Sequence, residues 1–297
     1  MSAVWSAIVA IGAVIGSADL GWVAAAVAVD TAMLAAQASR WRLLLRSLRS
    51  GATLWEALLA YSAGVFVGNV TPARAVGGDA CRTALIPRPG GSPPLSAIGA
   101  SVIYDRATDA AGIVFLALIA VPALRLESPY WLAFAVVLAI AGAFAARPLL
   151  RRFAARIAER HHSVVGHNMR AAFTGALACS AGIWLLDITR TIFVAAAFGV
   201  RLSPFQAAAV AILRIGSGAV PIPGGIGVVD GALVAGFIWL GLPRDTAVAI
   251  AIVERAIVYG WDTAMGAVSL LLVGGVRALR QARSGPAAIE VAAGTTT

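Results

Sequence analysis

Arginines and carboxylates lie within apolar stretches of this chain, where they could bind an anionic group such as a phosphate. A guanidinium donates paired hydrogen bonds to phosphates and carboxylates, and a charge at membrane depth is costly unless it faces protein or water. Their clustering predicts a hydrated polar pathway, although a structural ion pair is an equal alternative for any single residue. The candidate binding residues are Arg74, Arg82, Arg106, Arg190, Arg214, Arg255, Asp79, Asp105, Asp109, Asp187, Asp230, Glu254, Tyr259 and Asp262.

Helical spacing suggests partners for some of these residues. Arg106 can pair with Asp109, and Asp187 with Arg190, because residues three positions apart meet on one helix face. Asp30 has no local partner, and its role stays open. A further face at helical spacing carries Arg255, Tyr259 and Asp262.

Two stretches rich in proline and glycine repeat one pattern. The first reads NVTPARAVGGDACR (Asn69–Arg82), and the second reads GAVPIPGGIGVVDG (Gly218–Gly231). Paired breaks inside apolar segments are typical of the discontinuous helices of transporters. The break residues are Asn69, Pro72, Gly77, Gly78, Pro221, Pro223, Gly224, Gly225 and Gly227.

The first break suggests a place where a phosphate could bind. Gly77 and Gly78 predict a turn, followed by a helix that begins with Asp79 as its N-cap. A half-helix that begins at mid-membrane points free N–H groups into a cavity, and Arg74 and Arg82 would add positive charge beside it. Capping alone is an equally good interpretation of Asp79.

The composition is that of an integral membrane protein. The chain is 60% hydrophobic and 12% charged, with a mean hydropathy of +0.87, whereas soluble domains carry about 25% charged residues. Its formal charge of +9 comes from arginines at the ends of apolar runs, which is typical of membrane topology signals and not of a nucleic-acid-binding face. Apolar runs long enough to cross a membrane occupy about 2–18, 20–39, 95–121, 129–146, 170–198 and 246–275.

We therefore expect an all-α, polytopic membrane protein with about six transmembrane helices plus two re-entrant helical hairpins in an inverted repeat. The hairpins correspond to the two breaks, whose apolar pieces are each too short to cross alone. A single transmembrane domain spans 1–283, and 284–297 forms a disordered tail. The repeat units cover about 53–121 and 204–275.

Arginine placement predicts the orientation. Arginine-rich segments follow the second, fourth and sixth apolar runs, and the other loops carry few arginines. The positive-inside rule then places both termini in the cytoplasm of a multi-pass protein of the plasma membrane, and the two hairpins enter from opposite faces. The arginines that follow the second run are Arg40, Arg42, Arg46 and Arg49.

No pattern for catalysis or for a cofactor stands out. Cys81 and Cys179 form neither a CxxC motif nor a disulfide framework, and no nucleophile–base or Walker A pattern is present. A short loop motif holds His161, His162 and His167, but no carboxylate or cysteine completes a metal site there. We expect no catalytic residue, metal, cofactor or nucleic-acid partner.

Four motifs resemble the lysylphosphatidylglycerol synthase transmembrane region family: RWRLLL (Arg40–Leu45), the Pro72–Arg82 run, the Asp105-Arg106 pair and PGGIGVVDG (Pro223–Gly231). The resemblance covers about 24–276 and implies a flippase-like domain of the UPF0104 type. Asp230 stands where the family often has glutamate, which keeps the carboxylate. Bifunctional members add a soluble aminoacyltransferase that this chain lacks, so we expect a transporter and not an enzyme.

The resemblance implies translocation of a phospholipid or polyprenyl-phosphate-type headgroup between leaflets, through a polar groove between the hairpins. The expected partners are membrane lipids: an anionic or aminoacylated phospholipid, or a polyprenyl phosphate. Two alternatives stay open: an ion- or proton-coupled transporter of a small anionic solute, and an accessory membrane subunit of lipid-linked glycan or aminoacyl-lipid synthesis. Homo-oligomer formation is also open.

Overall fold

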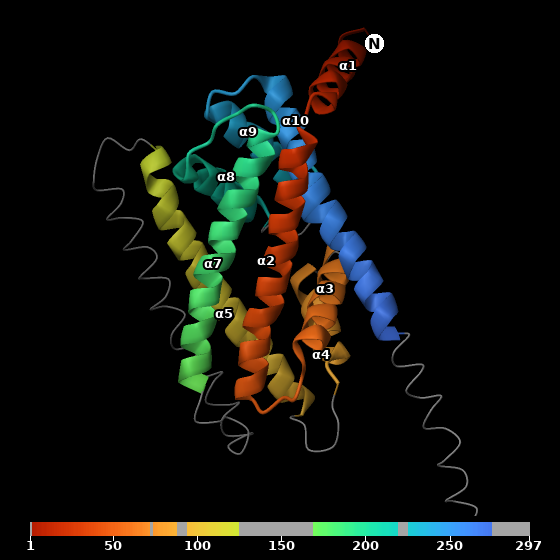
Figure 1. Ribbon diagram of the computed structural model, residues 1–297, viewed down its shortest axis with the longest axis vertical. Helices are drawn as coiled ribbons and strands as arrows, with labels where there is room; N and C mark the ends of the chain where they lie inside the picture. Colours follow the sequence, from red (N-terminus) through yellow and green to blue (C-terminus); the bar gives the residue numbers. More distant parts are fainter. Residues whose placement is uncertain (1, 72–73, 88–93, 125–168, 219–224, 275–297) are drawn as a thin grey trace, which may run out of the picture.

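The computed structural model describes residues 2–71, 74–87, 94–124, 169–218 and 225–274, and within these ranges every regular element is helical. The prediction of an all-α protein is therefore confirmed. The elements, labelled in Figure 1, are α1 (Ser2–Gly16), α2 (Leu20–Ser47), α3 (Leu54–Val70), α4 (Arg74–Leu85), α5 (Leu95–Ala120), the 3-10 turn η1 (Val121–Leu124), α7 (Met169–Ala196), α8 (Pro204–Ser217), α9 (Val228–Trp239), α10 (Arg244–Arg255) and the π-helix η3 (Ala256–Trp261), after which the chain stays helical to 274.

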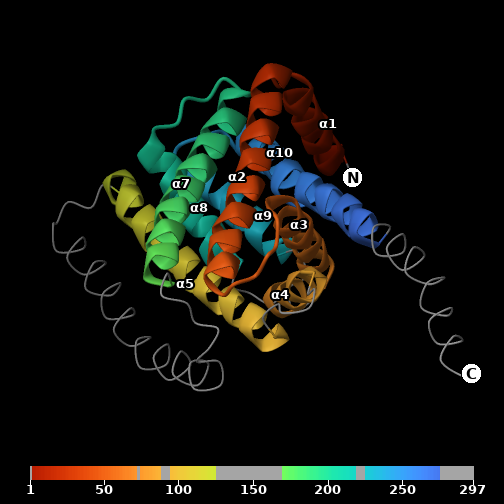
Figure 2. The same cartoon turned by 60° about the horizontal axis from the view of Figure 1, so that its bottom comes forward.

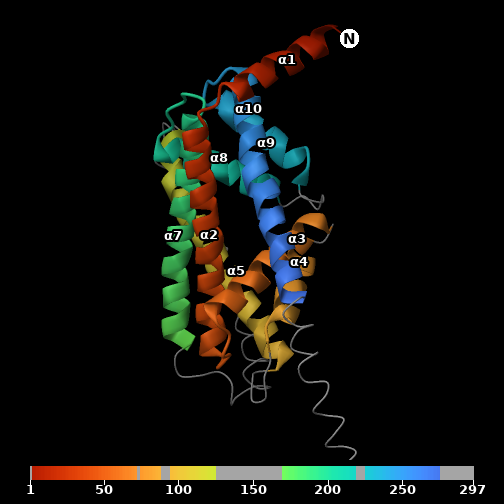
Figure 3. The ribbon, with the colours of Figure 1, turned by 45° about the vertical axis from the view of Figure 1, so that its right-hand side comes forward.

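Among the described residues, four helices are long and apolar enough to cross a membrane: Leu20–Ser47, Ala97–Ala123, Ala171–Ala196 and Arg244–Gly274. They match four of the apolar runs predicted from the sequence. The predicted run at 129–146 and the predicted tail at 284–297 lie outside the described residues. Helix α1 has 15 residues, fewer than the roughly 20 needed to span, and it points away from the bundle (Figure 3).

The order of helices in the first half of the chain recurs in the second half. Helices α2 to α5 correspond to α7 to α10, and α2 lies beside α7 in every view (Figures 1 and 2). Because α2 and α7 run in opposite directions, the pair α3–α4 lies at one end of the bundle and α8–α9 at the other (Figure 1). The two units are therefore inverted with respect to each other.

Local structure repeats along with the helix order. After α2 and α7 the chain reverses at residues with left-handed backbone, Arg49 with φ 60° and Gly199 with φ 71°. The next helices, α3 and α8, begin at capping boxes whose N-caps are Thr53 and Ser203. Both the reversals and the caps are 150 positions apart, so each unit turns its chain and starts its short helix in the same way.

Each predicted break separates two short helices that pack against each other. Helix α3 ends at Val70, where Thr71 takes extended backbone, and α4 begins at Arg74. In the second unit, α8 ends at Ser217 and α9 begins at Val228. The break residues Pro72, Pro221, Pro223 and Gly224 lie outside the described residues, whereas Gly225 and Gly227 precede α9 with positive φ.

The glycines of the first break lie inside α4, so the predicted turn there is wrong. A Cβ on Gly78 would lie 2.6 Å from the carbonyl oxygen of Gly64 in α3, and one on Gly64 would lie 2.8 Å from the carbonyl oxygen of Gly78. A Cβ on Gly77 would meet the hydroxyl of Thr71. Glycine is needed here because the backbones of α3 and α4 touch.

Substitution of Gly78 by leucine is expected to force α3 and α4 apart and to lower the free energy of unfolding by about 1–3 kcal/mol or more. Thermal unfolding of the purified protein in detergent would measure the loss. Gly99→Leu in α5 is the matched control, because a Cβ there meets nothing within 4 Å. Equal melting temperatures for the two variants would contradict the close packing of α3 on α4.

Candidate functional site

Buried charges gather in two groups, one in each unit. We name each group after the helix that contributes more of its residues than any other helix does. The α5 cluster consists of Arg40, Arg82, Asp105 and Asp109, with Asp79 and Arg106 at its edge; the α7 cluster consists of Asp30, Asp187, Arg190, Arg214 and Glu254.

Asp105 is the centre of the α5 cluster. Its Oδ1 accepts a hydrogen bond from Nε of Arg40 at 2.8 Å, and its Oδ2 accepts one from Nη1 of Arg82 at 2.8 Å. Nη1 of Arg40 also donates to Asp109 and to the hydroxyl of Ser180 in α7, each at 2.9 Å. These contacts join α2, α4, α5 and α7, so the cluster holds the first unit together and ties it to the second.

Arg40 and Asp109 differ from their sequence-based interpretations. Arg40 is buried within α2, and does not follow the helix as a topology signal. It takes Asp109 as its partner, so the predicted pair between Arg106 and Asp109 is wrong. The apolar residues Leu44 and Leu45 continue the buried face beyond Arg40, and this continuation was the available signal that the helix is longer.

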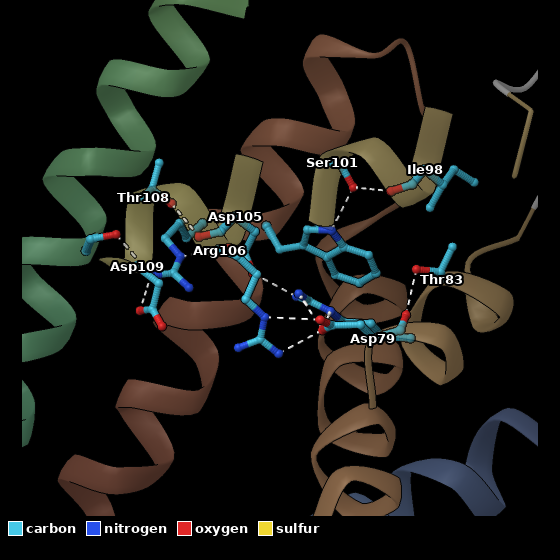
Figure 4. Close-up of polar contacts among 12 residues, drawn as sticks. Asp79, Thr83, Ile98, Ser101, Asp105, Arg106, Thr108 and Asp109 are labelled. Atoms are coloured by element: carbon cyan, nitrogen blue, oxygen red, sulfur yellow. Dashed lines mark hydrogen bonds and ion pairs between the residues drawn. The ribbon is translucent and has the colours of Figure 1, made fainter. Parts of the chain in front are cut away.

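Arg82 is enclosed by aromatic rings. Its guanidinium carbon lies 4.8 Å from the centroid of the Trp41 ring and 4.9 Å from that of Tyr61. The indole N–H of Trp41 in turn donates to Ser101 at 2.8 Å (Figure 4). The buried guanidinium of Arg82 is held in place by the two aromatic rings and by Asp105. These contacts favour a structural role for Arg82, as an ion pair that joins helices, over a role in binding a headgroup.

Asp79 and Arg106 form an ion pair (Figure 4), and the side chain of Arg106 is the most exposed one of the α5 cluster. Nε and Nη2 of Arg106 donate to the two carboxylate oxygens of Asp79 at 3.1 and 2.9 Å, and the Arg106 side chain is 52% exposed. Asp79 lies within α4, five residues after the helix begins, so its predicted role as N-cap is wrong. It also pairs with Arg82 on the next turn.

Arg190 is the centre of the α7 cluster and is fully buried. Its Nη1 donates to Asp30 in α2 at 3.0 Å, and its Nη2 lies 2.7 Å from Asp187 and 2.8 Å from Glu254 in α10. Nη2 of Arg214 in α8 contacts both oxygens of Asp187, at 2.7 and 2.6 Å. The predicted pair between Asp187 and Arg190 is confirmed, and Asp30 finds its partner 160 positions away.

The second unit also has a more accessible pair. Nε of Arg255 lies 3.3 Å from Asp230, whose other oxygen accepts a hydrogen bond from the backbone N–H of Gly227 at 2.8 Å. The guanidinium of Arg255 covers the ring of Tyr259, and the Tyr259 hydroxyl donates to the carbonyl oxygen of Asn69 at 3.2 Å. The break in the first unit therefore touches the long helix of the second.

The two accessible pairs occupy equivalent places. In each unit, an aspartate of the second short helix binds an arginine of the following long helix: Asp79 with Arg106, and Asp230 with Arg255. In each long helix the preceding residue, Asp105 or Glu254, belongs to a buried cluster. The sequence repeat is thus also a repeat of ion pairs.

Two further candidates are Arg74 and Asp262. Arg74 begins α4, but its side chain is outside the described residues. Asp262 is partly buried in the helical stretch after η3. Sequence reasoning missed Arg40 as a site residue and left Asp30 open, because their partners come from other helices. No group of His, Cys, Asp or Glu residues suited to a metal ion occurs in the described part of the chain.

The comparisons with known proteins agree with the motifs. A family model described as the lysylphosphatidylglycerol synthase TM region matches residues 2–266. A UPF0104 membrane protein of Methanothermobacter thermautotrophicus is 25% identical over 290 residues, covering 85% of this chain and 86% of the relative. The UPF0104 membrane protein PH1989 of Pyrococcus horikoshii is 23% identical over 296 residues, covering 86% and 88%. No solved structure matches significantly. The resemblance predicted from the motifs is confirmed.

Proposed function

Because this chain belongs to the lysylphosphatidylglycerol synthase TM region family of membrane proteins, we propose that it moves the headgroup of an anionic or aminoacylated phospholipid, or of a polyprenyl phosphate, between the two leaflets. The proposal assigns the chain a transport role and no catalytic step. Three observations support this role: the inverted order of the two units, the charges inside the bundle, and the phospholipid lysylphosphatidylglycerol in the description of the family.

The observation that carries the proposal is the pair of equivalent arginines that keep part of their side chains exposed. Arg106 is 52% exposed and Arg255 19% exposed, whereas Arg40, Arg82 and Arg190 are buried among their carboxylates. A lipid phosphate can replace a carboxylate on a guanidinium, because both present oxygens to the same planar donors. Asp79 would then hold Arg106 while no headgroup is bound.

The inverted arrangement supports movement between two faces. The proposal places α3–α4 and α8–α9 as re-entrant hairpins that enter the bilayer from opposite sides, with both termini in the cytoplasm of the plasma membrane. Arg106 would receive the phosphate from one leaflet and Arg255 from the other. The acyl chains would stay in the bilayer, against the apolar outer faces of the long helices.

A vesicle assay tests the function. The purified chain is reconstituted into liposomes with a trace of fluorescent phosphatidylglycerol, and dithionite destroys the fluorophores in the outer leaflet. We expect the protected inner fraction to become accessible with the protein present and to stay protected in protein-free liposomes. Excess unlabelled phosphatidylglycerol should compete with the fluorescent lipid and slow its movement between the leaflets. Soluble glycerol phosphate should leave the rate of this movement unchanged. Inner fluorescence that stays protected with the protein present would overturn the proposal, and inhibition by glycerol phosphate alone would favour a small-anion transporter.

A further inference from the structure

The α7 cluster contains more negative than positive groups, and the headgroup pathway does not use the excess. Two arginines, Arg190 and Arg214, face three carboxylates, those of Asp30, Asp187 and Glu254. Asp30 and Arg190 are 0% exposed and Glu254 is 1% exposed. Arginine stays charged in proteins, so the cluster carries one negative charge in excess when every carboxylate is ionised.

Two arginines on the neighbouring helices form ion pairs with carboxylates that lie outside this cluster. Within the described ranges, Arg255 is paired with Asp230, and Arg40 is paired with the carboxylates of α5. These ion pairs add no cation to the α7 cluster.

The corresponding cluster of the first unit is balanced. Three arginines there, Arg40, Arg82 and Arg106, face three aspartates: Asp79, Asp105 and Asp109. One of the differences between the two clusters lies at a pair of equivalent positions in α2 and α7. The hydroxyl of Ser180 contacts Arg40, whereas the carboxylate of Asp30, 150 positions earlier, contacts Arg190. One unit thus uses a neutral group where the other uses a charge.

Hydrogen bonding indicates which oxygens could hold a proton. Both oxygens of Asp187 contact Arg214, and Oδ1 also lies close to Arg190, so neither oxygen of this carboxylate lacks a cationic partner. Oδ2 of Asp30 and Oε2 of Glu254 are buried, and neither has a hydrogen-bond partner within the described residues. The unpartnered oxygen of a buried carboxylate is a place where a proton can be held, because a neutral acid is less costly to bury than a charge that is only partly compensated. Because both side chains bind Arg190, the proton belongs to the pair and not to one residue.

We propose that Asp30 and Glu254 share one transferable proton, and that its uptake from one side of the membrane and release to the other are coupled to movement of the headgroup. The step makes and breaks only the O–H bond of a carboxylic acid. This inference rests on the proposed function, and it adds an energy source to it.

The position of Glu254 offers a route for the coupling. Glu254 precedes Arg255, which is the proposed headgroup residue of the second unit, and Arg190 joins Glu254 in α10 to Asp30 in α2. Loss of the proton strengthens the attraction of both helices to Arg190, and its return weakens this attraction. Protonation thus changes how firmly a helix of one unit is held to a helix of the other.

The coupling is tested in liposomes that carry fluorescent phosphatidylglycerol and a pH gradient, with the membrane potential held at zero by potassium and valinomycin. For one proton per lipid, the ratio of probe between leaflets should shift by about tenfold for each pH unit and should reverse with the gradient. Asp30→Asn and Glu254→Gln each remove the proton site. Either variant should lose the shift of the lipid ratio with the pH gradient, even if it still moves lipid at a measurable rate. Asp245→Asn, at the exposed start of α10, is the control that should keep it.

A second measurement separates this inference from the proposed function. Infrared spectroscopy of the purified protein at neutral pH should show the carbonyl stretch of a buried carboxylic acid, and either variant should remove this band. If lipid moves but its ratio between the leaflets does not depend on the pH gradient, the proposed coupling is wrong and the proposed translocation still stands. Absence of the band in the unchanged protein would overturn the proton site. If no lipid moves but the band is present, the proposed function fails and the proton site stands.

Discussion

Substitution of Arg190 by leucine is expected to reduce the free energy of unfolding by about 3–5 kcal/mol or to prevent folding, because it leaves buried carboxylates without their shared cation. Arg190 is the contact through which α2, α7 and α10 share their charges. Leucine fills part of the volume but cannot compensate the carboxylates of Asp30 and Glu254. Thermal or denaturant unfolding in detergent would measure the effect.

Two further variants show that charge is the cause of this loss. Adding Glu254→Gln to Arg190→Leu removes one uncompensated carboxylate, so part of the lost stability should return. Arg201→Leu changes an exposed arginine in the turn before α8 and should alter stability by no more than about 0.5 kcal/mol. An Arg190→Leu protein as stable as the unchanged protein would show that the cluster does not hold the two units together.

The long helices could be predicted from the sequence because membrane spans require extended apolar length, which is a local property. The helices observed at 95–120 and 169–196 agree closely with the runs predicted at 95–121 and 170–198. The end of α2 was placed too early, because arginine inside an apolar helix looks like the end of a span. Arg40 stays inside the helix because Asp105, brought in by another helix, compensates its charge.

The sequence did not predict those features of the site that depend on contacts between helices, namely the close approach of two backbones and the ion pairs between distant segments. Gly77-Gly78 looked like a turn because glycine disfavours helix, but in α4 it serves the contact with Gly64 of α3. The partner of Asp30 is 160 positions away, and no spacing rule within one helix could find it. By contrast, Asp187 and Arg190 share a helix, so their pairing followed from the sequence alone.

Removal of the accessible arginines is expected to have the largest effect on lipid movement. Arg106→Ala and Arg255→Ala should each slow the probe in liposomes by about tenfold to a hundredfold, because a hydrogen bond to a charged group contributes about 1.5–3 kcal/mol. Each single change should slow movement in both directions, since a headgroup that crosses must reach both arginines. Arg244→Ala, at the exposed start of α10, is the matched control.

Loss of rate alone could also come from structural damage, and Asp79→Asn distinguishes the two causes. If a phosphate and the carboxylate of Asp79 compete for Arg106, neutralising Asp79 frees the arginine, so binding of anionic lipid should become tighter. Release of the headgroup should then become slower, because no carboxylate remains to displace it. Tighter binding together with slower movement is not expected from a damaged protein. Weaker binding to Asp79→Asn, or unchanged rates for Arg106→Ala and Arg255→Ala, would show that these ion pairs only join helices.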